Sequence, residues 1–514
     1  MAQSAVEVEQ KFDVDGSTPL PELGKIDGVS RVGDPVTHAL EAVYFDTPDL
    51  ALAAHRITLR RRTGGADAGW HLKIPQSPGK RAEIHAPLGQ PDHVPEELLV
   101  RVQAYTRGHK LAPVATLDTE RISYPLYQED DQRVAEFVDD HVRARVSVGG
   151  RVSVGDSAGQ SWREWEVELN GSGDEAAGEA FLDAAATVLA KTGAKPSERS
   201  SKLATAFGDS WPRAKGSGRE IPQRKGPAVV PVLNYLDQQV ARLLLHDAHV
   251  RMNRDDSVHQ MRAVTRRIRS VLHSCRKLFK AYPVEELEAG LKSLAKTLGR
   301  YRDAEVLHER LRKSLDELPG KLVLGPLQSE LDERMKVRKD TSLAAIHSRL
   351  DSPRYFRLLD QLEAFLEAPP VAAEAMPGAR KTTRKLVNKA AKRLAKRHDA
   401  AVAAAVGPSR DKAFHEVRKA AKKLRFAAAA VESVHGKGAA KIADAAHNVQ
   451  SVLGKHQDSA VARTELLKLG SAEGAGNGAF TYGVLHAAER AAADSAQLEY
   501  LRSGKKARKL RLKK

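Results

Sequence analysis

The sequence predicts a two-domain α+β protein, in which an N-terminal antiparallel β-sheet or barrel precedes an entirely helical C-terminal half. Three observations support this prediction. The 514 residues exceed what one hydrophobic core normally supports. Short β-type runs fill the chain to about residue 170, and amphipathic segments rich in Ala, Leu, Arg, Lys and Glu fill it after about residue 228. Residues 208–227 are rich in Pro, Gly and charge, and we expect a linker there.

Turn residues separate the β-type runs, as they do in hairpins. Gly64-Gly65, Pro78-Gly79 and Gly149-Gly150 are such breaks. The expected strands are VEVEQKF, ALEAVYFDT, RITLRRRT, WHLKIP, RAEIHAPL, RISYPLY, RVAEFVDDHVRARVSV and SWREWEVELN. Two helices are expected in the same half, at EELLVRVQAYT and DEAAGEAFLDAAATVLAKTG.

The helical half repeats itself. VHQMRAVTRRIRSVL contains His259 and FHEVRKAAKKLRFAA contains His415, and in both the basic residues follow at offsets of +3, +7, +8 and +10. A matching LGxxxD comes after each copy, ending at Asp303 and at Asp458. A period of about 155 residues indicates two related helical bundles that face each other. We expect them at about 228–366 and 377–500, followed by a flexible basic tail at 501–514.

Charge is distributed unevenly along the chain. Residues 1–210 contain 23 Lys and Arg against 33 Asp and Glu, and the rest contains 60 against 33. The helical half is therefore expected to meet a polyanion. Nucleic acid is not the expected polyanion, because aromatic residues make up only 5% and do not interleave with the basic ones.

Cysteine usage and hydropathy indicate the compartment. Cys275 is the only cysteine, which excludes an intrachain disulfide and a cysteine-rich metal site. The sequence contains neither a signal-peptide pattern nor an apolar stretch of membrane-spanning length. We expect a cytoplasmic protein with no membrane partner.

Like charges share strand faces in the N-terminal half. Glutamates recur at every second position in VEVEQK and REWEVEL, and arginines do so in RITLRRR. One such strand alone indicates an ordinary half-buried strand. Repetition with segregated charges instead favours a barrel that points them inward, toward an anionic ligand with a divalent metal. Because Mg²⁺ and Mn²⁺ prefer oxygen ligands, the candidate metal ligands are Glu7, Glu9, Glu166 and Glu168.

These residues resemble the CYTH domain of the triphosphate tunnel metalloenzymes over about residues 1–207. The resemblance implies an eight-stranded antiparallel tunnel that hydrolyses or cyclises triphosphates with Mg²⁺ or Mn²⁺. It implies metal binding by the four glutamates and phosphate binding by Lys11, Arg60, Arg62, Lys73, Arg121 and Lys202. It also implies a further acid from RVAEFVDDHV. There Glu136 and Asp140 share a face that Asp139 opposes, and the identity of this acid stays open.

The repeated helix carries a basic stripe in each copy. Helical geometry places on one face of each helix the residues His259, Arg262, Arg266 and Arg269, and His415, Arg418, Lys422 and Arg425. Like charges at these spacings cost a few tenths of a kcal/mol each, which an anionic ligand would offset. This half resembles the CHAD domain over about residues 228–500. The resemblance implies two pseudo-symmetric four-helix bundles that bind polyphosphate along both stripes.

The sequence therefore predicts a Mg²⁺- or Mn²⁺-dependent triphosphatase acting on inorganic triphosphate or short-chain polyphosphate, with a helical polyphosphate-binding domain. Association with polyphosphate granules would follow from that binding. Two alternatives stay open. One is a non-catalytic polyphosphate-binding or targeting protein. The other is a thiamine triphosphatase or adenylate cyclase, because the motifs describe the phosphate chain and not what is attached to it.

Overall fold

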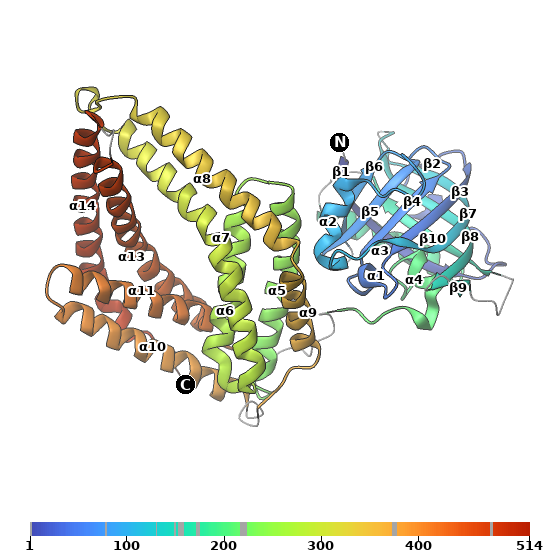
Figure 1. Cartoon of the computed structure of the whole chain (residues 1–514). Helices are drawn as coiled ribbons and strands as arrows, with labels where there is room; N and C mark the ends of the chain where they lie inside the picture. Colours follow the sequence, from blue (N-terminus) through green and yellow to red (C-terminus); the bar gives the residue numbers. More distant parts are fainter. Residues whose placement is uncertain are drawn as a thin grey trace. The chain divides into compact units, whose positions relative to one another are not determined.

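The computed structural model describes residues 3–77, 80–129, 131–148, 151–152, 159–170, 175–215, 224–372, 378–472 and 476–513. The chain forms two compact units, Met1–Lys215 and Gly216–Lys514 (Figure 1). The first is an antiparallel β-barrel with short helices, and the second consists of helices. The predicted fold class is confirmed.

Eight antiparallel strands close the barrel. They run in the order β7-β3-β4-β5-β6-β1-β10-β8, and β8 pairs again with β7. The strands are β1 (Gln3–Val14), β3 (Val36–Asp46), β4 (Thr58–Thr63), β5 (Gly69–Ser77), β6 (Lys80–Ala86), β7 (Ala112–Tyr127), β8 (Arg133–Val148) and β10 (Gln160–Leu169). Short strands β2 (Arg31–Val32), β9 (Arg151–Val152) and β11 (Lys195–Pro196) pair with β7, β8 and β1. Each predicted run corresponds to a strand to within three residues at either end, except that the first half of β7 was not predicted. Pro113, Asp118 and Glu120 have low strand propensity there.

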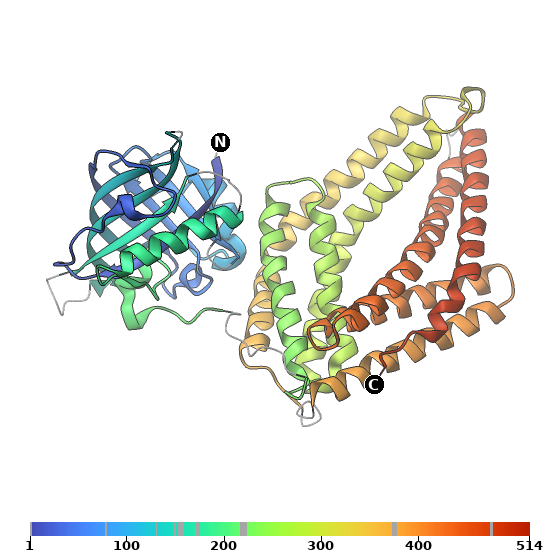
Figure 2. The same ribbon diagram turned by 180° about the vertical axis from the view of Figure 1, so that it is seen from behind.

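Two helices cover the outer face of the barrel. Figure 2 shows α3 (Glu175–Ala190) lying across it, where Phe181 packs with Phe12 and Trp165. Leu98 of α2 (Glu96–Thr106) packs with Trp70 in a second cluster. Because the outward side chains of these strands are apolar, their charged neighbours point into the barrel.

A short helix fills one end of the barrel interior. The hydroxyl of Ser201 accepts a hydrogen bond from Ala204 N at 3.1 Å and so caps α4 (Lys202–Phe207). Phe207 then packs against Tyr44 and Val142, which share strand faces with the inward charges. The other short helical segments of this unit are η1 (Leu23–Lys25), α1 (Ala51–Ala54) and η2 (Gly208–Ser210).

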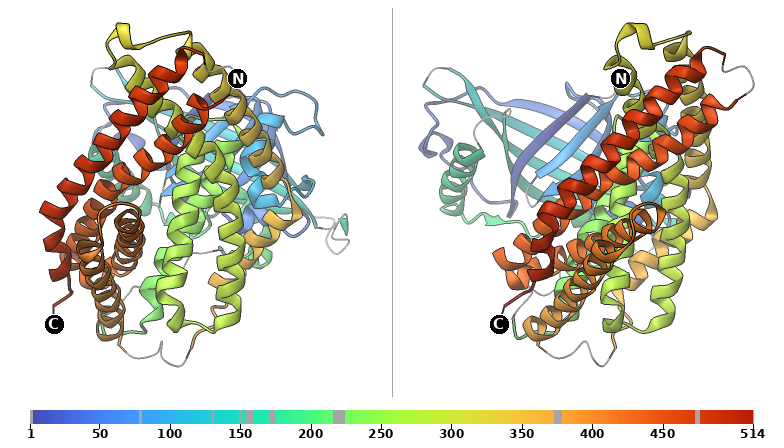
Figure 3. Two further views of the ribbon diagram at one scale, coloured as in Figure 1. Left: turned by 60° about the vertical axis from the view of Figure 1, so that its left-hand side comes forward. Right: turned by 90° about the vertical axis from the view of Figure 1, so that its left-hand side faces the viewer.

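The helical unit contains two copies of a four-helix arrangement. The first copy has α5 (Val229–Arg251), α6 (Ser257–Cys275), α7 (Ala281–Asp316) and α8 (Leu327–Leu350), and the second has α10 (Ala379–Ala403), α11 (Pro408–Ala429), α13 (Lys437–Gly470) and α14 (Gly478–Ser503). Additional segments are η3 (Arg276–Leu278), η4 (Gly320–Leu322), α9 (Pro353–Glu367), α12 (Glu432–His435) and η6 (Gly504–Lys509). Consecutive long helices of each copy pack side by side (Figure 3). None of the helices among the described residues is long and apolar enough to cross a bilayer.

The two copies contact each other through several pairs of elements, among them α5 with α10. The helices that carry the basic stripes, α6 and α11, pack against each other. Farther along the bundles, Leu311 of α7 and Met335 of α8 join an apolar cluster with Leu466 of α13 and Leu485 of α14. The predicted facing of the two repeats is therefore seen at α6 and α11.

The C-terminal segment is folded against the bundle, so the expectation of a flexible tail is wrong for residues 504–513. Leu512 is buried, and its backbone exchanges two hydrogen bonds with the Asn388 side chain, at 2.8 and 3.1 Å. Arg508 pairs with Asp399 at 3.0 Å. The basic composition of this segment gave no sign of the buried Leu512 side chain, of the backbone hydrogen bonds of Leu512 with Asn388 or of the Arg508–Asp399 ion pair.

Candidate active site

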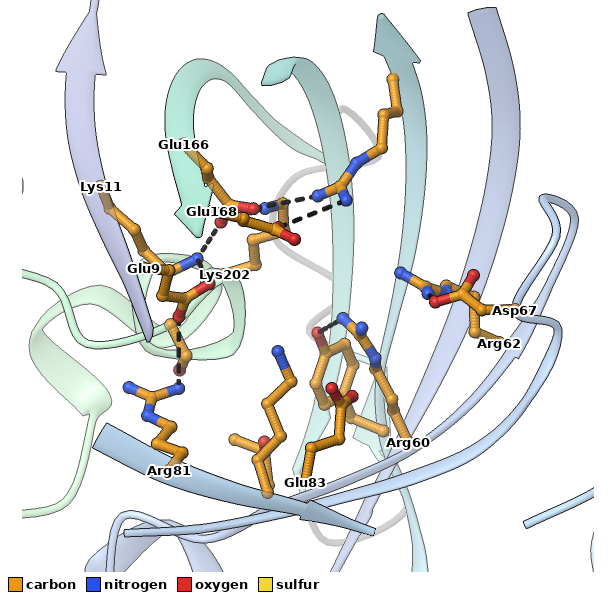
Figure 4. A pocket seen from close by; sticks show the side chains of 15 residues that line it. Glu9, Lys11, Arg60, Arg62, Asp67, Arg81, Glu83, Glu166, Glu168 and Lys202 are labelled. Carbon is orange, nitrogen blue, oxygen red and sulfur yellow. Dashed lines mark hydrogen bonds and ion pairs between the residues drawn. The ribbon is translucent and has the colours of Figure 1, made fainter. Parts of the chain in front are cut away.

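Charged side chains from most strands converge on a cavity of about 90 Å³ inside the barrel (Figure 4). Three of the five lining carboxylates come from β1 and β10, the other two are Glu83 of β6 and Asp67 after β4, and most of the cations come from β4, β5 and β6. The lining residues are Glu9, Lys11, Tyr44, Thr58, Arg60, Arg62, Asp67, Lys73, Arg81, Glu83, Arg121, Glu166, Glu168, Ser201 and Lys202. The charge segregation predicted from strand periodicity is present in the cavity wall.

The acidic wall is built by the pairing of β1 with β10. Glu9 lies opposite Glu168, and Lys11 lies opposite Glu166. The ammonium of Lys11 forms an ion pair with Glu166 and lies 3.4 Å from Glu9 Oε2. A single cation thus joins carboxylates of both strands.

Lys202 is the second cation of this wall. Its nitrogen lies 2.7 Å from Glu166 Oε1, 2.8 Å from Asp140 Oδ2 and 2.9 Å from Glu164 Oε1. Burial alone would lower the pKa of Lys202, but Asp140 and Glu164 raise it. Lys202 is therefore held as a buried ammonium.

Two sets of three carboxylates have oxygen atoms close enough to hold a metal ion, within 4.8 Å of one another. One set is Asp140, Glu164 and Glu166, and these are the three groups that surround the Lys202 ammonium. The other set is Glu9, Glu166 and Glu168, and all three line the cavity. Carboxylate oxygens suit Mg²⁺ and Mn²⁺, so the second set fits a divalent metal.

The predicted fourth ligand, Glu7, lies in β1 opposite Arg81, and its side chain falls outside the described residues. The acidic residues of β8 point to different faces of the strand. Asp140 is fully buried in the interior, where Arg121 donates to it at 2.9 and 2.7 Å. Asp139 faces the outer cluster and binds Arg163 at 2.8 Å. Glu136 is half-buried, pairs with Arg133 at 2.6 Å and does not line the cavity.

The basic wall contains donors without acceptors. Arg60 donates to the Tyr44 hydroxyl at 3.3 Å, and Arg62 forms an ion pair with Asp67. The Nε atoms of both arginines are nevertheless buried and lack a hydrogen-bond partner among the described residues. Lys73 lines the same wall. An anion in the cavity would offer acceptors to the Arg60 and Arg62 guanidinium groups.

Burial and neighbouring charges set the protonation of the cavity. Burial would raise the pKa of Glu9, but Lys11 and Lys73 hold it below the usual range. Burial would also raise the pKa of Glu83, but the hydrogen bond with His71 and the charge of Lys73 lower that pKa to about 2. Burial and repulsion from Arg60 and Arg121 lower the pKa of Arg62 to about 9. At neutral pH the cavity therefore holds ionised acids opposite mutually repelling cations.

Some lining residues were missing from the predicted site. Arg81 and Glu83 lie in the alternating run RAEIHAPL, so their inward direction was visible in the sequence. Tyr44 lies in a predicted strand, but an aromatic residue on a strand usually indicates core. Asp67 lies between β4 and β5, and no strand period places it.

A second charged site lies where α6 packs against α11. We name it the five-cation cluster, and it consists of Arg262, Arg266, Arg269, Arg418 and Lys422. Burial, followed by repulsion from the four arginines, lowers the pKa of Lys422 to about 6. Burial and the neighbouring arginines also lower the pKa of Arg266 to about 10. Cations from both repeats thus face one another without enough acid to neutralise them.

The LGxxxD motif supports this cluster. The guanidinium of Arg262 lies against Gly299, where an added Cβ would be 3.6 Å from Nε, and Arg418 lies against Gly454 in the same way, at 3.9 Å. Arg262 also pairs with Asp303 at 3.2 Å. The Nε atoms of both arginines are buried and make no hydrogen bond within the described parts of the chain.

The other predicted stripe residues are placed differently. His415 Nδ1 lies 2.7 Å from Gln457 Oε1, and His259 is half-buried beside Arg302. Arg425 lies apart from the five-cation cluster and lines another cavity with Arg267. Arg425 lies at the edge of the predicted stripe. Where two helices cross, residues at the edge of one face can turn away from the contact, and Arg425 does so although the equivalent Arg269 belongs to the cluster.

Comparison with known proteins identifies the two units. Residues 5–198 match the CYTH domain family, and residues 234–467 match the CHAD domain family. Uncharacterized proteins from two strains of Mycobacterium tuberculosis, CDC 1551 and H37Rv, are each 42% identical over 497 residues, which cover 94% of this chain and 93% of theirs. The chain belongs to the CYTH–CHAD proteins. CYTH domains are divalent-metal enzymes that act as triphosphatases or cyclases, and the carboxylates of this CYTH barrel fit such a metal.

Solved structures similar to parts of this CYTH–CHAD chain include PptA from Streptomyces chartreusis. It is 22% identical, with a TM-score of 0.46, over 54% of this chain and 99% of its own. The CHAD domain from the plant Ricinus communis is 21% identical, with a TM-score of 0.43, over 56% of this chain and 95% of its own.

Proposed function

We propose that the CYTH barrel hydrolyses inorganic triphosphate or short-chain polyphosphate with Mg²⁺ or Mn²⁺, and that the CHAD domain binds polyphosphate. One observation carries the first part: carboxylates that fit a divalent metal and arginines with unsatisfied Nε donors line one cavity. Binding of a metal–triphosphate complex needs carboxylates for the metal ion and cationic side chains for the phosphate groups in the same cavity.

Different lining residues are assigned to the metal ion and to the phosphate chain. Glu9, Glu166 and Glu168 would hold the divalent ion, which supplies charge neutralisation and polarises phosphoryl oxygens when bound. Arg60 and Arg62 line the same cavity, and their guanidinium groups would bind and neutralise the phosphate chain. Lys73, Arg81 and Lys11 add positive charge to the same cavity, while Asp140 fixes Arg121 and Lys202 in position.

Water is the proposed nucleophile. Ser201 lines the cavity, but its hydroxyl caps α4, and Tyr44 is engaged by Arg60. The cavity wall contains no cysteine. Positioning and neutralisation of the phosphate chain then account for most of the acceleration, as in other phosphoryl transfers.

Cavity size favours a substrate without an organic group. About 90 Å³ is small beside the roughly 300–1,000 Å³ of pockets that enclose drug-sized molecules. Tyr44 is the one aromatic residue in the wall, and its ring belongs to the apolar cluster at the closed end. This supports inorganic triphosphate over thiamine triphosphate and ATP.

The test is phosphate release from tripolyphosphate, thiamine triphosphate and ATP, each with Mg²⁺, with Mn²⁺ and with a chelator. We expect tripolyphosphate to give the highest kcat/KM and the chelator to abolish turnover. Cyclic AMP as the main product from ATP would instead assign the barrel to a cyclase. Turnover that persists in the presence of chelator would contradict the proposed dependence on a divalent metal ion.

The five-cation cluster supports polyphosphate binding by the CHAD domain. Burial and repulsion from the four arginines lower the pKa of Lys422, so a polyanion would relieve a cost already present in the fold. We expect the chain to bind long-chain polyphosphate more tightly than duplex DNA at matched salt. Equal affinity for both would reduce the cluster to a non-specific basic surface.

A further inference from the structure

The two halves of the CHAD domain are related by pseudo-symmetry, so equivalent positions can be compared, and some of them carry different residues. The repeated motifs relate α6 to α11 by 156 positions and α7 to α13 by 155 positions. Three pairs of equivalent residues follow from these offsets: Arg267 with Lys423, His273 with Ala429, and Glu288 with Ala443.

On one side of the α6–α11 contact, a chain of polar contacts fills the space. Lys423 Nζ lies 3.0 Å from His273 Nε2, and His273 Nδ1 lies 3.3 Å from Glu288 Oε2. The cation of this side is therefore matched by a histidine and a carboxylate from the opposite repeat.

On the other side, the histidine and the glutamate are replaced by Ala429 and Ala443, and a cavity of about 290 Å³ opens. Arg242, Arg267 and Arg425 line it. The guanidinium of Arg425 lies over the Phe426 ring at 5.3 Å, but none of the three arginines forms an ion pair in the described parts of the chain. Three guanidinium groups around a cavity recruit an anion.

Two acceptors in the same wall restrict the kind of anion. Gln239 is 2% exposed, and its Oε1 atom is buried without a partner among the described residues. Asp444 also lines the cavity, where its exposed carboxylate acts on Arg425. Polyphosphate at neutral pH offers mainly acceptor oxygens, so it cannot donate a hydrogen bond to Gln239 Oε1, and the Asp444 carboxylate repels it. A ligand that carries an O–H or N–H donor as well as negative charge would satisfy Gln239 Oε1 and the arginines together.

We propose that this cavity binds a phosphate monoester that carries hydroxyl groups, such as a sugar phosphate or a nucleoside monophosphate. The arginines bind the phosphate, and Gln239 and Asp444 accept hydrogen bonds from the hydroxyls. The volume is at the lower end of small-molecule pockets. This site is separate from the five-cation cluster, since the two share no residue.

Isothermal titration of the full chain with AMP and with glucose 6-phosphate tests the proposal. We expect one site per chain for at least one ester, with Arg267→Gln and Asp444→Asn each weakening it by roughly tenfold or more. Ala443→Glu restores the carboxylate of the other half and should remove binding without removing an arginine. Lys423→Gln, at the equivalent of Arg267, is the matched control and should leave ester binding unchanged.

The proposal is overturned if neither ester binds to the folded chain at millimolar concentration. It is also overturned if Arg267→Gln and Ala443→Glu both leave ester affinity unchanged. Tighter polyphosphate binding by Asp444→Asn, with no binding of either ester, would assign the cavity to the polyphosphate path. Thermal unfolding of each variant establishes that the chain is folded.

Discussion

Lys202 places its ammonium nitrogen 2.7 Å from Glu166 Oε1, at the point where α4 enters the barrel. Asp140 and Glu164 lie almost as close to the same nitrogen, at 2.8 and 2.9 Å. One of the two carboxylate sets is therefore neutralised by the protein itself. Glu166 is shared with the other set, Glu9, Glu166 and Glu168, which contacts Lys11 and Arg121 and differs in that all three of its carboxylates line the cavity.

Lys202→Met should destabilise the barrel strongly. The substitution keeps the length of the side chain but leaves three buried carboxylates without their cation, which typically costs about 3–5 kcal/mol. Urea unfolding of the wild type and the variant measures this change. Lys195→Met, at an exposed position in β11, is the control and should be near neutral. A stable Lys202→Met chain would show that a proton or metal ion replaces the ammonium.

Charge reversal at Arg262 and Arg418 should weaken polyphosphate binding by roughly tenfold or more, because both unpaired Nε donors are lost and two negative charges enter the cluster. Competition titration with long-chain polyphosphate at fixed salt measures the effect. Lys385→Glu and Lys389→Glu change the same net charge on the exposed face of α10. Equal losses in both double variants would contradict a localised site.

Polyphosphate binding should take up a proton at Lys422. Burial and the four arginines lower the pKa of Lys422 to about 6, so it is largely neutral in the free chain near pH 7.5. A bound polyanion raises that pKa, and affinity should therefore be greater near pH 5.5 than near pH 8. Titration calorimetry in two buffers of different ionisation enthalpy measures the uptake.

Lys422→Arg is the control for this proton, because arginine stays charged throughout the range. Its proton uptake should vanish while polyphosphate binding is retained. The same pKa has a consequence for stability. The folded chain binds fewer protons than the unfolded chain between pH 6 and the ordinary lysine pKa of 10.5, so this group adds stability as the pH rises through that window. Undiminished uptake in Lys422→Arg would place the proton elsewhere.

Cys275 should not react with thiol reagents in the native chain. It is 1% exposed in α6, and burial raises the pKa of its thiol to about 12. Ellman's reagent near pH 8 should therefore modify it only after urea unfolding. Rapid native-state reaction would show that α6 opens locally.

Strand periodicity predicted many of the residues that line the barrel cavity, because inward and outward residues must alternate. Glu9, Arg60 and Glu166 could be placed on an inner face from spacing alone. Periodicity could not distinguish Glu136 from Asp140, since both share a face, and only position along β8 separates them. Nor could it show that Lys202 occupies one carboxylate set, which depends on where α4 enters the barrel.

In the helical half, the repeat predicted that two basic helices face each other. It did not predict the departure of Arg425 from the cluster, because the crossing of α6 and α11 decides which edge residues meet. The folded C-terminal segment was missed for a related reason. A single leucine, Leu512, and two hydrogen bonds to Asn388 outweigh a basic composition that is typical of flexible tails.

The most direct test of the account compares phosphate release from tripolyphosphate with Mg²⁺ by the wild type, Glu166→Gln and Glu136→Gln. Glu166 belongs to the metal-fitting set, whereas Glu136 lies outside the cavity beside Arg133. We predict that Glu166→Gln loses about 100-fold or more in kcat/KM and that Glu136→Gln keeps it within about threefold. Equal, metal-independent rates in all three folded proteins would contradict a catalytic role for the barrel.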